Sequence, residues 1–313
     1  MQLYSRPLDN IIAVEYFLQN ALQLPIKKDR YLKKIIPSIV DGELGVTYFN
    51  EDKQTLSRLE MRDTSYRSAD DRWKLREKII EELFTTKRLL NDDKIKLGKG
   101  GALPQTGPKP EQKAFIIIGL PASGKSSLAS IIAENYRAMM IDSDYAKRKL
   151  PEYSHHLYGA SIVHEESNAI IFGFEKGQKS IPALFERCLN NKYNVIIPKI
   201  GNNPKPILEL AKWLKEKKNY EVHLVFAALS KRDSTIRAVY RFAKSKRYVP
   251  LGLIFDGYGN DPFVTYYYLR SKHNSLFTSF TAVSTAGKPA FLTDQSGHAP
   301  IFGYDIKNVI LQL

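Results

Sequence analysis

The chain has 313 residues, of which 43% are hydrophobic and 11% aromatic, so it can form one large domain with an appendage or two domains. Its formal net charge of +14 suits polyanionic partners such as nucleotides, nucleic acid or an acidic membrane surface. A single cysteine, Cys188, excludes an intramolecular disulfide framework and fits a reducing compartment such as the cytoplasm. No apolar run approaches the roughly 18 residues of a membrane span, and we expect no secretory signal.

The first 96 residues are predicted to be mainly helical. Apolar residues recur at helical spacing in Leu8–Leu24 and Asp70–Leu90, whereas residues 41–55 favour turns and a short hairpin. Residues 97–113 concentrate glycine and proline without periodicity, which is typical of a linker or an extended arm. The sequence therefore predicts an N-terminal mainly helical region (1–96), a linker (97–113) and a main domain (114–313).

After the linker, short apolar strands alternate with helices. Strands are predicted near 113–120, 137–144, 194–200 and 221–229, and helices at Lys125–Asn135, Ser161–Phe174, Ile181–Asn190, Pro204–Lys218 and 231–246. This alternation implies right-handed crossovers, and hence an α/β fold with a parallel sheet flanked by helices. Beyond about residue 270, we expect short strands with Gly and Pro turns that close the domain.

The segment Gly119–Ser126 has the pattern of a glycine, four residues and Gly-Lys-Ser, placed between an apolar strand and a helix. Backbone N–H groups in such a P-loop form an anion cradle, which the positive end of the helix completes. We expect Lys125 to neutralise the β- and γ-phosphates of ATP and Ser126 to bind Mg²⁺. The predicted nucleotide-binding residues are Gly119, Ala122, Ser123, Gly124, Lys125, Ser126 and Ser127.

Two aspartates, Asp142 and Asp144, follow the second predicted strand, whereas the third and fourth strands end without a carboxylate. Because strand tips line the ligand crevice of such sheets, both should face the phosphates, with Asp142 as a further Mg²⁺ ligand. This layout favours a small-molecule kinase in which an aspartate accepts the proton of the acceptor hydroxyl. The guanidinium groups of Arg237, Arg241 and Arg247 match phosphate oxygens on a lid.

Several segments occur in the order found in zeta-toxin kinases, which the chain resembles over about residues 112–270. They are the P-loop, "IDSDYAKRKLPEY", "VHEES", "YNVIIPKIG", "EVHLVF" and "RAVYRF…KRYVP". The resemblance implies a P-loop, nucleotide-kinase-like fold that uses ATP and Mg²⁺. It places the catalytic base on Asp144, the P-loop lysine on Lys125 and two phosphate-clamping arginines on Arg241 and Arg247.

Toxins of this family phosphorylate the 3′-hydroxyl of UDP-N-acetylglucosamine, and a helical antitoxin that obstructs the ATP site often blocks them. The resemblance thus implies a kinase that acts on a nucleotide or sugar-nucleotide, with a toxin or effector role and an inhibitory antitoxin as partner. Where those toxins have Glu-Gly-Thr, however, this chain has Pro198-Lys199-Ile200. Lys199 therefore suggests an anionic group on the acceptor, and Glu166, near a helix start, is a second candidate substrate residue.

Two alternatives stay open. A nucleic-acid-end kinase would fit the basic charge, although we see no basic stripe interleaved with aromatic residues of the kind that binds single strands. A non-catalytic interaction protein switched by nucleotide is the other. The N-terminal region has no counterpart in the resemblance, and its role as an inhibitor in cis, a cap on the sheet or a delivery segment is left open.

Overall fold

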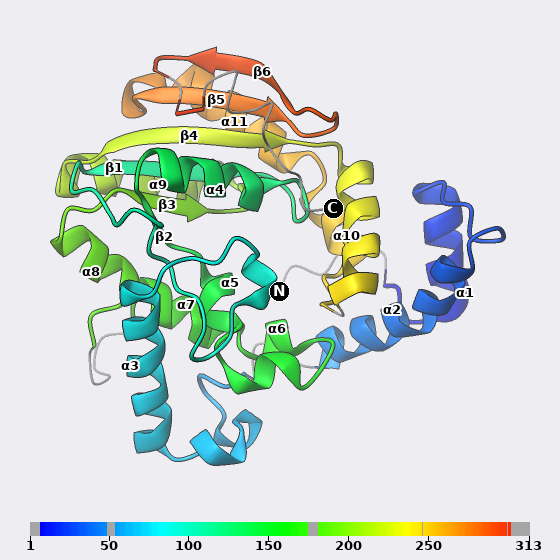
Figure 1. Cartoon of the computed structure of the whole chain (residues 1–313). Helices are drawn as coiled ribbons and strands as arrows, with labels where there is room; N and C mark the ends of the chain where they lie inside the picture. Colours follow the sequence, from blue (N-terminus) through cyan, green and yellow to red (C-terminus); the bar gives the residue numbers. More distant parts are fainter. Residues whose placement is uncertain (1–6, 49–53, 175–180, 246, 299, 302–313) are drawn as a thin grey trace.

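A six-stranded sheet forms the centre of the computed structural model, which describes residues 7–48, 54–174, 181–245, 247–298 and 300–301 (Figure 1). The strand order is β2-β3-β1-β4-β5-β6, with β6 antiparallel to β5 and the other strands parallel. The strands are β1 (Lys113–Ile118), β2 (Met139–Met140), β3 (Val195–Pro198), β4 (Glu221–Ala228), β5 (Ser279–Ser284) and β6 (Phe291–Ser296). The predicted α/β fold with a mostly parallel sheet is confirmed.

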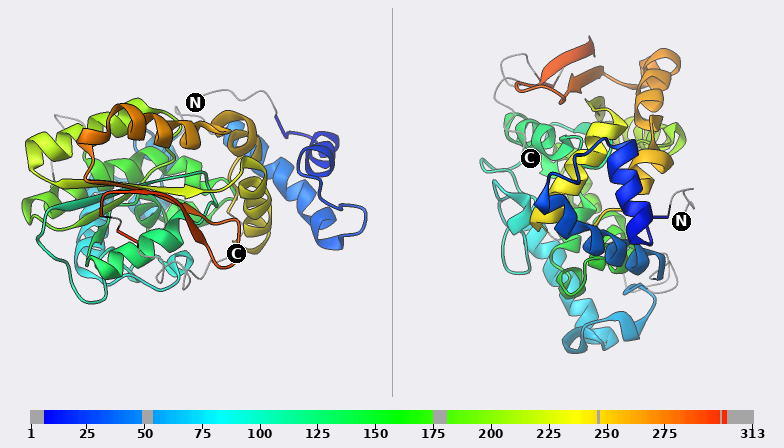
Figure 2. Two further views of the ribbon diagram at one scale, coloured as in Figure 1. Left: turned by 90° about the horizontal axis from the view of Figure 1, so that it is seen from above. Right: turned by 90° about the vertical axis from the view of Figure 1, so that its right-hand side faces the viewer.

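Helices cover both faces of this sheet. Helix α4 (Lys125–Asn135) packs on one face, whereas α9 (Pro204–Lys212) and α11 (Asp261–Lys272) lie on the other (Figure 2). Further helices are α1 (Ile11–Tyr16), α2 (Arg30–Tyr48), α3 (Ala69–Thr85), α5 (Ser143–Lys147), α6 (Gly159–Ile162), α7 (His164–Phe172), α8 (Leu184–Asn190) and α10 (Lys231–Ser245). Within the described ranges, no helix combines the length and the apolar character that crossing a membrane would need.

The central strand β1 is buried on both faces because helices cover them. Residues 114–118 are fully buried, and Leu128 and Ile132 of α4 belong to the same core. Burying one isoleucine or leucine side chain contributes roughly 1.5–3 kcal/mol. The strand therefore gives a rigid base to the loop that follows it.

The N-terminal region packs in two separate places. Helix α3 inserts Leu75, Ile79 and Leu83 into the core that contains β1. Helices α1 and α2 instead form a second core with α10, on the side of α10 that faces away from the sheet (Figure 1, Figure 2). The N-terminal helices thus support both the sheet and α10.

The structure differs from the sequence prediction between the two helices predicted at Leu8–Leu24 and Asp70–Leu90. Residues 41–48 belong to α2, so the turn and hairpin predicted there are wrong for these residues, and 49–53 lie outside the described ranges. The segment 97–112 contains no helix or named strand, yet Ala102 is fully buried and its N–H donates to the carbonyl of Leu83 at 2.8 Å. The division at 96 and 114 stays a prediction, although the contacts of α3 and Ala102 cross it.

Candidate active site

The glycine-rich loop joins the central strand β1 to α4. Gly124 has φ of 90° and occupies the position before α4, a left-handed conformation that costs glycine little. A Cβ on Gly119 would lie 2.8 Å from the carbonyl oxygen of Ala227, so no larger residue fits there without displacing backbone. The two glycines therefore let the loop turn tightly at the carboxyl edge of the sheet.

Two hydrogen bonds from distant parts of the chain hold this loop. The hydroxyl of Thr285, just after β5, donates to the carbonyl of Ser123 at 2.7 Å, and Ser234 of α10 donates to the carbonyl of Pro121. Arg237, predicted to contact phosphate, donates instead to the carbonyl of Thr285 at 2.6 Å, although it also lines the pocket. Arg237 thus supports the loop indirectly, through Thr285.

Lys125 opens α4, and its ammonium group donates to the carbonyls of Gly119 and Leu120, both at 2.6 Å. Burial lowers the pKa of Lys125 to about 8, an effect that the nearby charges of Asp142 and Asp144 oppose. The cation therefore lies inside the loop, between its carbonyls and the two carboxylates.

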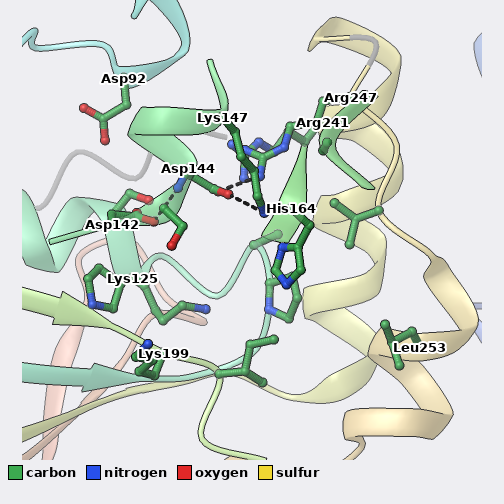
Figure 3. A pocket seen from close by; sticks show the side chains of 18 of the residues that line it. Asp92, Lys125, Asp142, Asp144, Lys147, His164, Lys199, Arg241, Arg247 and Leu253 are labelled. Carbon is green, nitrogen blue, oxygen red and sulfur yellow. Dashed lines mark hydrogen bonds and ion pairs between the residues drawn. The ribbon is translucent and has the colours of Figure 1, made fainter. Parts of the chain in front are cut away.

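The two aspartates lie at the start of α5 and have opposite electrostatic surroundings (Figure 3). Oδ1 of Asp142 accepts the N–H of Asp144 at 2.9 Å, and burial together with the charge of Asp144 raises the pKa of Asp142 to about 6. Asp144 pairs with Arg247 Nη2 at 2.5 Å and with Lys147 Nζ at 3.2 Å. Burial alone would raise the pKa of Asp144, but the charges of Arg247, Lys147 and Arg148 hold it well below its usual range.

The arginines gather above these aspartates. Arg241 and Arg148 both approach Asp93, at 3.4 and 3.0 Å. Nε and Nη1 of Arg247 are buried and, within the described part of the chain, have no hydrogen-bond partner. A buried guanidinium with two unused donors is suited to bind an anion.

These groups share one pocket of about 1490 Å³. Five of the predicted nucleotide-binding residues line it, and Gly119 and Ser123 are buried beneath: the lining residues are Ala122, Gly124, Lys125, Ser126 and Ser127. Asp142, Asp144, Lys199, Arg241 and Arg247 line it as well. The N-terminal region contributes Gln54 and the turn Asn91–Asp93, which the sequence did not single out.

The oxygen donors fit a magnesium ion in part. Ser126 presents an exposed hydroxyl at the start of α4, and Asp142 supplies a carboxylate in the same pocket. No group of three or more metal-binding side chains occurs among the residues that the structure describes. Mg²⁺ usually takes one or two carboxylates and completes its shell with water and substrate phosphates, so this sparse set suits it.

Lys199 follows β3, and its N–H donates to the carbonyl of Ile117 at 2.8 Å. Ile117 lies near the end of β1, so Lys199 is next to the start of the P-loop. Its ammonium lies 4.0 Å from the centroid of the Phe172 ring, and burial lowers its pKa. None of the described carboxylates forms an ion pair with it. His164 and Asn168 of α7 also line this side of the pocket and contact each other at 3.3 Å.

Glu166 is not part of the pocket, so its predicted substrate role is corrected. Its side chain is fully buried between α7 and α3, where it pairs with Arg72 at 2.6 Å and with Arg76 at 2.7 Å. Burial would raise the pKa of Glu166, but these arginines lower it to about 2. The carboxylate therefore joins the N-terminal region to the sheet domain.

Lys147 and Arg148 are pocket residues that the sequence reasoning missed. The signal was present, because both follow Asp144 by three or four residues and thus share its side of a helical turn. Asp93 carried no comparable signal, since only the folded chain brings its turn beside α10.

The fold and the pocket define an α/β protein with a glycine-rich loop at the tip of its central strand and a carboxylate pair facing that loop. The family model described as Zeta toxin matches residues 101–256, about half of the chain. Over this segment the chain belongs to the zeta toxin family, as the sequence motifs predicted.

Two relatives can be compared directly. The curated protein Toxin zeta of Streptococcus agalactiae is 26% identical over 131 residues, which are 41% of this chain and 44% of that protein. The match therefore spans less than half of the relative. A solved structure described as "Molecular and structural characterization of the PezAT chromosomal toxin-antitoxin system of the human pathogen Streptococcus pneumoniae" is 13% identical, covers 77% of this chain and 86% of that chain, and has a TM-score of 0.49.

Proposed function

We propose that this protein is an ATP- and Mg²⁺-dependent kinase that phosphorylates a hydroxyl group of a nucleotide or sugar-nucleotide. One observation carries the proposal. The carboxylate of Asp144 and the P-loop residue Lys125 open into one pocket, where Arg247 contacts that carboxylate and keeps two donors unused. A donor phosphate, an acceptor hydroxyl and a compensating cation can meet there.

The chain's own groups have distinct roles in this proposal. The amides of the P-loop and Lys125 hold the triphosphate, and Arg241 and Arg247 neutralise charge on the transferring group. The bond between the γ-phosphorus and the bridging oxygen breaks, a bond to the acceptor oxygen forms, and Asp144 takes the hydroxyl proton as ADP leaves. Bound Mg²⁺, held by Ser126 and Asp142, would supply further charge neutralisation at the phosphates.

The low pKa of Asp144 suits this role. Its two cationic partners keep it ionised at neutral pH, so it can always accept a hydrogen bond from the acceptor hydroxyl. A weak base is sufficient because phosphoryl transfer proceeds through a loose transition state in which positioning and charge neutralisation dominate.

The size and charge of the pocket support a large anionic acceptor. Ligand pockets commonly measure about 300–1,000 Å³, and the present one, of about 1490 Å³, has room for a donor and an acceptor. Lys199 offers a cation without a described carboxylate partner. Family membership adds, as part of the proposal, a toxic role that an antitoxin neutralises.

The test is incubation of the full chain with ATP, Mg²⁺ and a panel of nucleotides and sugar-nucleotides, with mass spectrometry of the products. A new phosphorylated species should form and should disappear with Asp144→Asn. The matched control is Asp233→Asn, an exposed first-turn aspartate of α10 outside the pocket, which should leave product formation unchanged. Equal product from Asp144→Asn and wild type would contradict the proposal.

A further inference from the structure

Arg247 is followed in the chain by a buried and hydrogen-bonded residue. Arg247 reaches Asp144 with Nη2, at 2.5 Å, from the segment after α10. The next residue, Tyr248, is only 3% exposed, and its N–H donates to the carbonyl of Leu157 at 3.3 Å. A fixed tyrosine beside a pocket arginine limits how far the arginine can move.

Tyr248 is held mainly by α2, outside the segment that matches the zeta toxin family. Its hydroxyl donates to the carboxylate of Glu43, which is 2% exposed. Its ring packs directly on Gly42, where a Cβ would lie 2.5 Å from the ring carbon Cγ. On the other side the ring meets Phe242 of α10 nearly edge-on, with centroids 5.2 Å apart.

We propose that Glu43 and Tyr248 form a positioning pair through which α2 sets the location of Arg247 in the active site. This inference rests on the proposed kinase function. The N-terminal helices pack on α10 rather than lining the pocket: none of the described lining residues belongs to α1 or α2. They act on the site through Tyr248, one residue from the guanidinium that contacts Asp144.

Glu43 and Tyr248 are suited to this role because both are buried and the hydrogen bond between them limits the movement of each side chain. Burial raises the pKa of Glu43, although the hydrogen bond from Tyr248 lowers it. Loss of the tyrosine hydroxyl would leave a buried carboxylate without that donor, and the chain would relax around it. Displacing a catalytic group by about 1 Å can reduce turnover by roughly 100-fold.

The test uses Tyr248→Phe, which removes one hydroxyl and leaves the ring. The matched control is Tyr266→Phe: Tyr266 is fully buried in α11 and donates to Asp294 at 2.9 Å, and neither residue lines the pocket. We expect Tyr248→Phe to lower kcat for ATP consumption by about 10- to 100-fold. Tyr266→Phe should leave kcat unchanged, with a comparable shift in the unfolding temperature.

Two further measurements separate positioning from general loss of structure. In an Arg247→Ala background, Tyr248→Phe should cause no additional loss of kcat, because the residue that it positions is already absent. Glu43→Gln, which keeps an oxygen acceptor, should retain more activity than Glu43→Ala.

The outcomes distinguish this inference from the proposed function. If wild type consumes ATP and Tyr248→Phe does so equally well, or if its effect adds fully to that of Arg247→Ala, the positioning pair is refuted alone. If wild type neither binds a fluorescent ATP analogue nor consumes ATP, the proposed function and the inference both fail.

Discussion

Burial and the charge of Asp144 make the ionised carboxylate of Asp142 destabilising in the folded protein. Replacing Asp142 therefore tests the electrostatics of the pocket. Its carboxylate caps α5 in the buried end of the pocket, beside the ionised Asp144. Asn is an equally good helix-capping residue, so Asp142→Asn keeps the cap and removes only the charge. We expect this substitution to raise the stability of the ligand-free protein at pH 7 while it lowers the proposed kinase activity.

The magnitude follows from the pKa of Asp142, which burial and the charge of Asp144 raise from 3.8 to about 6. Between these two values the folded chain binds more protons than the unfolded chain, so this group's contribution to stability falls as the pH rises. The linkage relation gives a cost of about 3 kcal/mol at pH 7 and about 1 kcal/mol at pH 4.5. Asp142→Asn should therefore raise the free energy of unfolding by most of the roughly 3 kcal/mol at pH 7, but only by about 1 kcal/mol at pH 4.5.

Urea unfolding at the two pH values measures the effect, with an ATP-consumption assay on the same samples. Asp144→Asn is the matched comparison two residues away. Because its pKa is lowered by Arg247, Lys147 and Arg148, this variant should lose stability at pH 7. An Asp142→Asn protein that is less stable than wild type at pH 7, or whose gain is the same at both pH values, would refute this reasoning.

Three further substitutions test other parts of the structure. Glu166→Gln should lower the free energy of unfolding by about 3–5 kcal/mol in urea titrations, because buried Arg76 loses its carboxylate partner and buried Arg72 keeps only Glu152. Glu165→Gln, at a side chain 48% exposed, should change it by less than about 0.5 kcal/mol. Gly119→Ala should abolish binding of a fluorescent ATP analogue, since its Cβ would meet backbone at 2.8 Å, and unaltered binding would contradict the loop geometry. Asp93→Asn should tighten that binding about two- to fivefold by releasing Arg241, and weaker binding would oppose this expectation.

The P-loop and the pair of aspartates could be predicted from the sequence because each is a pattern of only a few neighbouring residues. The spacing from Gly119 to Ser126 requires only one turn, and Asp142 and Asp144 lie directly after an apolar strand. Both patterns are fixed by neighbouring residues, so distant packing does not change them. The structure brings Lys125, Ser126 and both aspartates into one pocket, as the parallel sheet implied.

The roles of Glu166 and Arg237 could not be predicted in the same way because each depends on a distant partner. Glu166 is 94 residues from Arg72, and Arg237 is 48 residues from Thr285. One signal was overlooked: Arg72 and Arg76 interrupt the apolar face that includes Leu75 of α3. Arginines at i and i+4 on a buried face require carboxylate partners, which would have favoured a structural role for a nearby glutamate.

The segment that matches the zeta toxin family, 101–256, does not contain everything that holds its own site in place. On its N-terminal side, α3 supplies the cations for Glu166, and α2 contacts Tyr248. On its C-terminal side, Thr285 after β5 holds the P-loop carbonyl of Ser123. The wall of the pocket also includes Gln54 and the turn 91–93. Because these parts lie outside the segment that matches the family model, a search for the acceptor of the proposed kinase should start from this chain's own pocket wall.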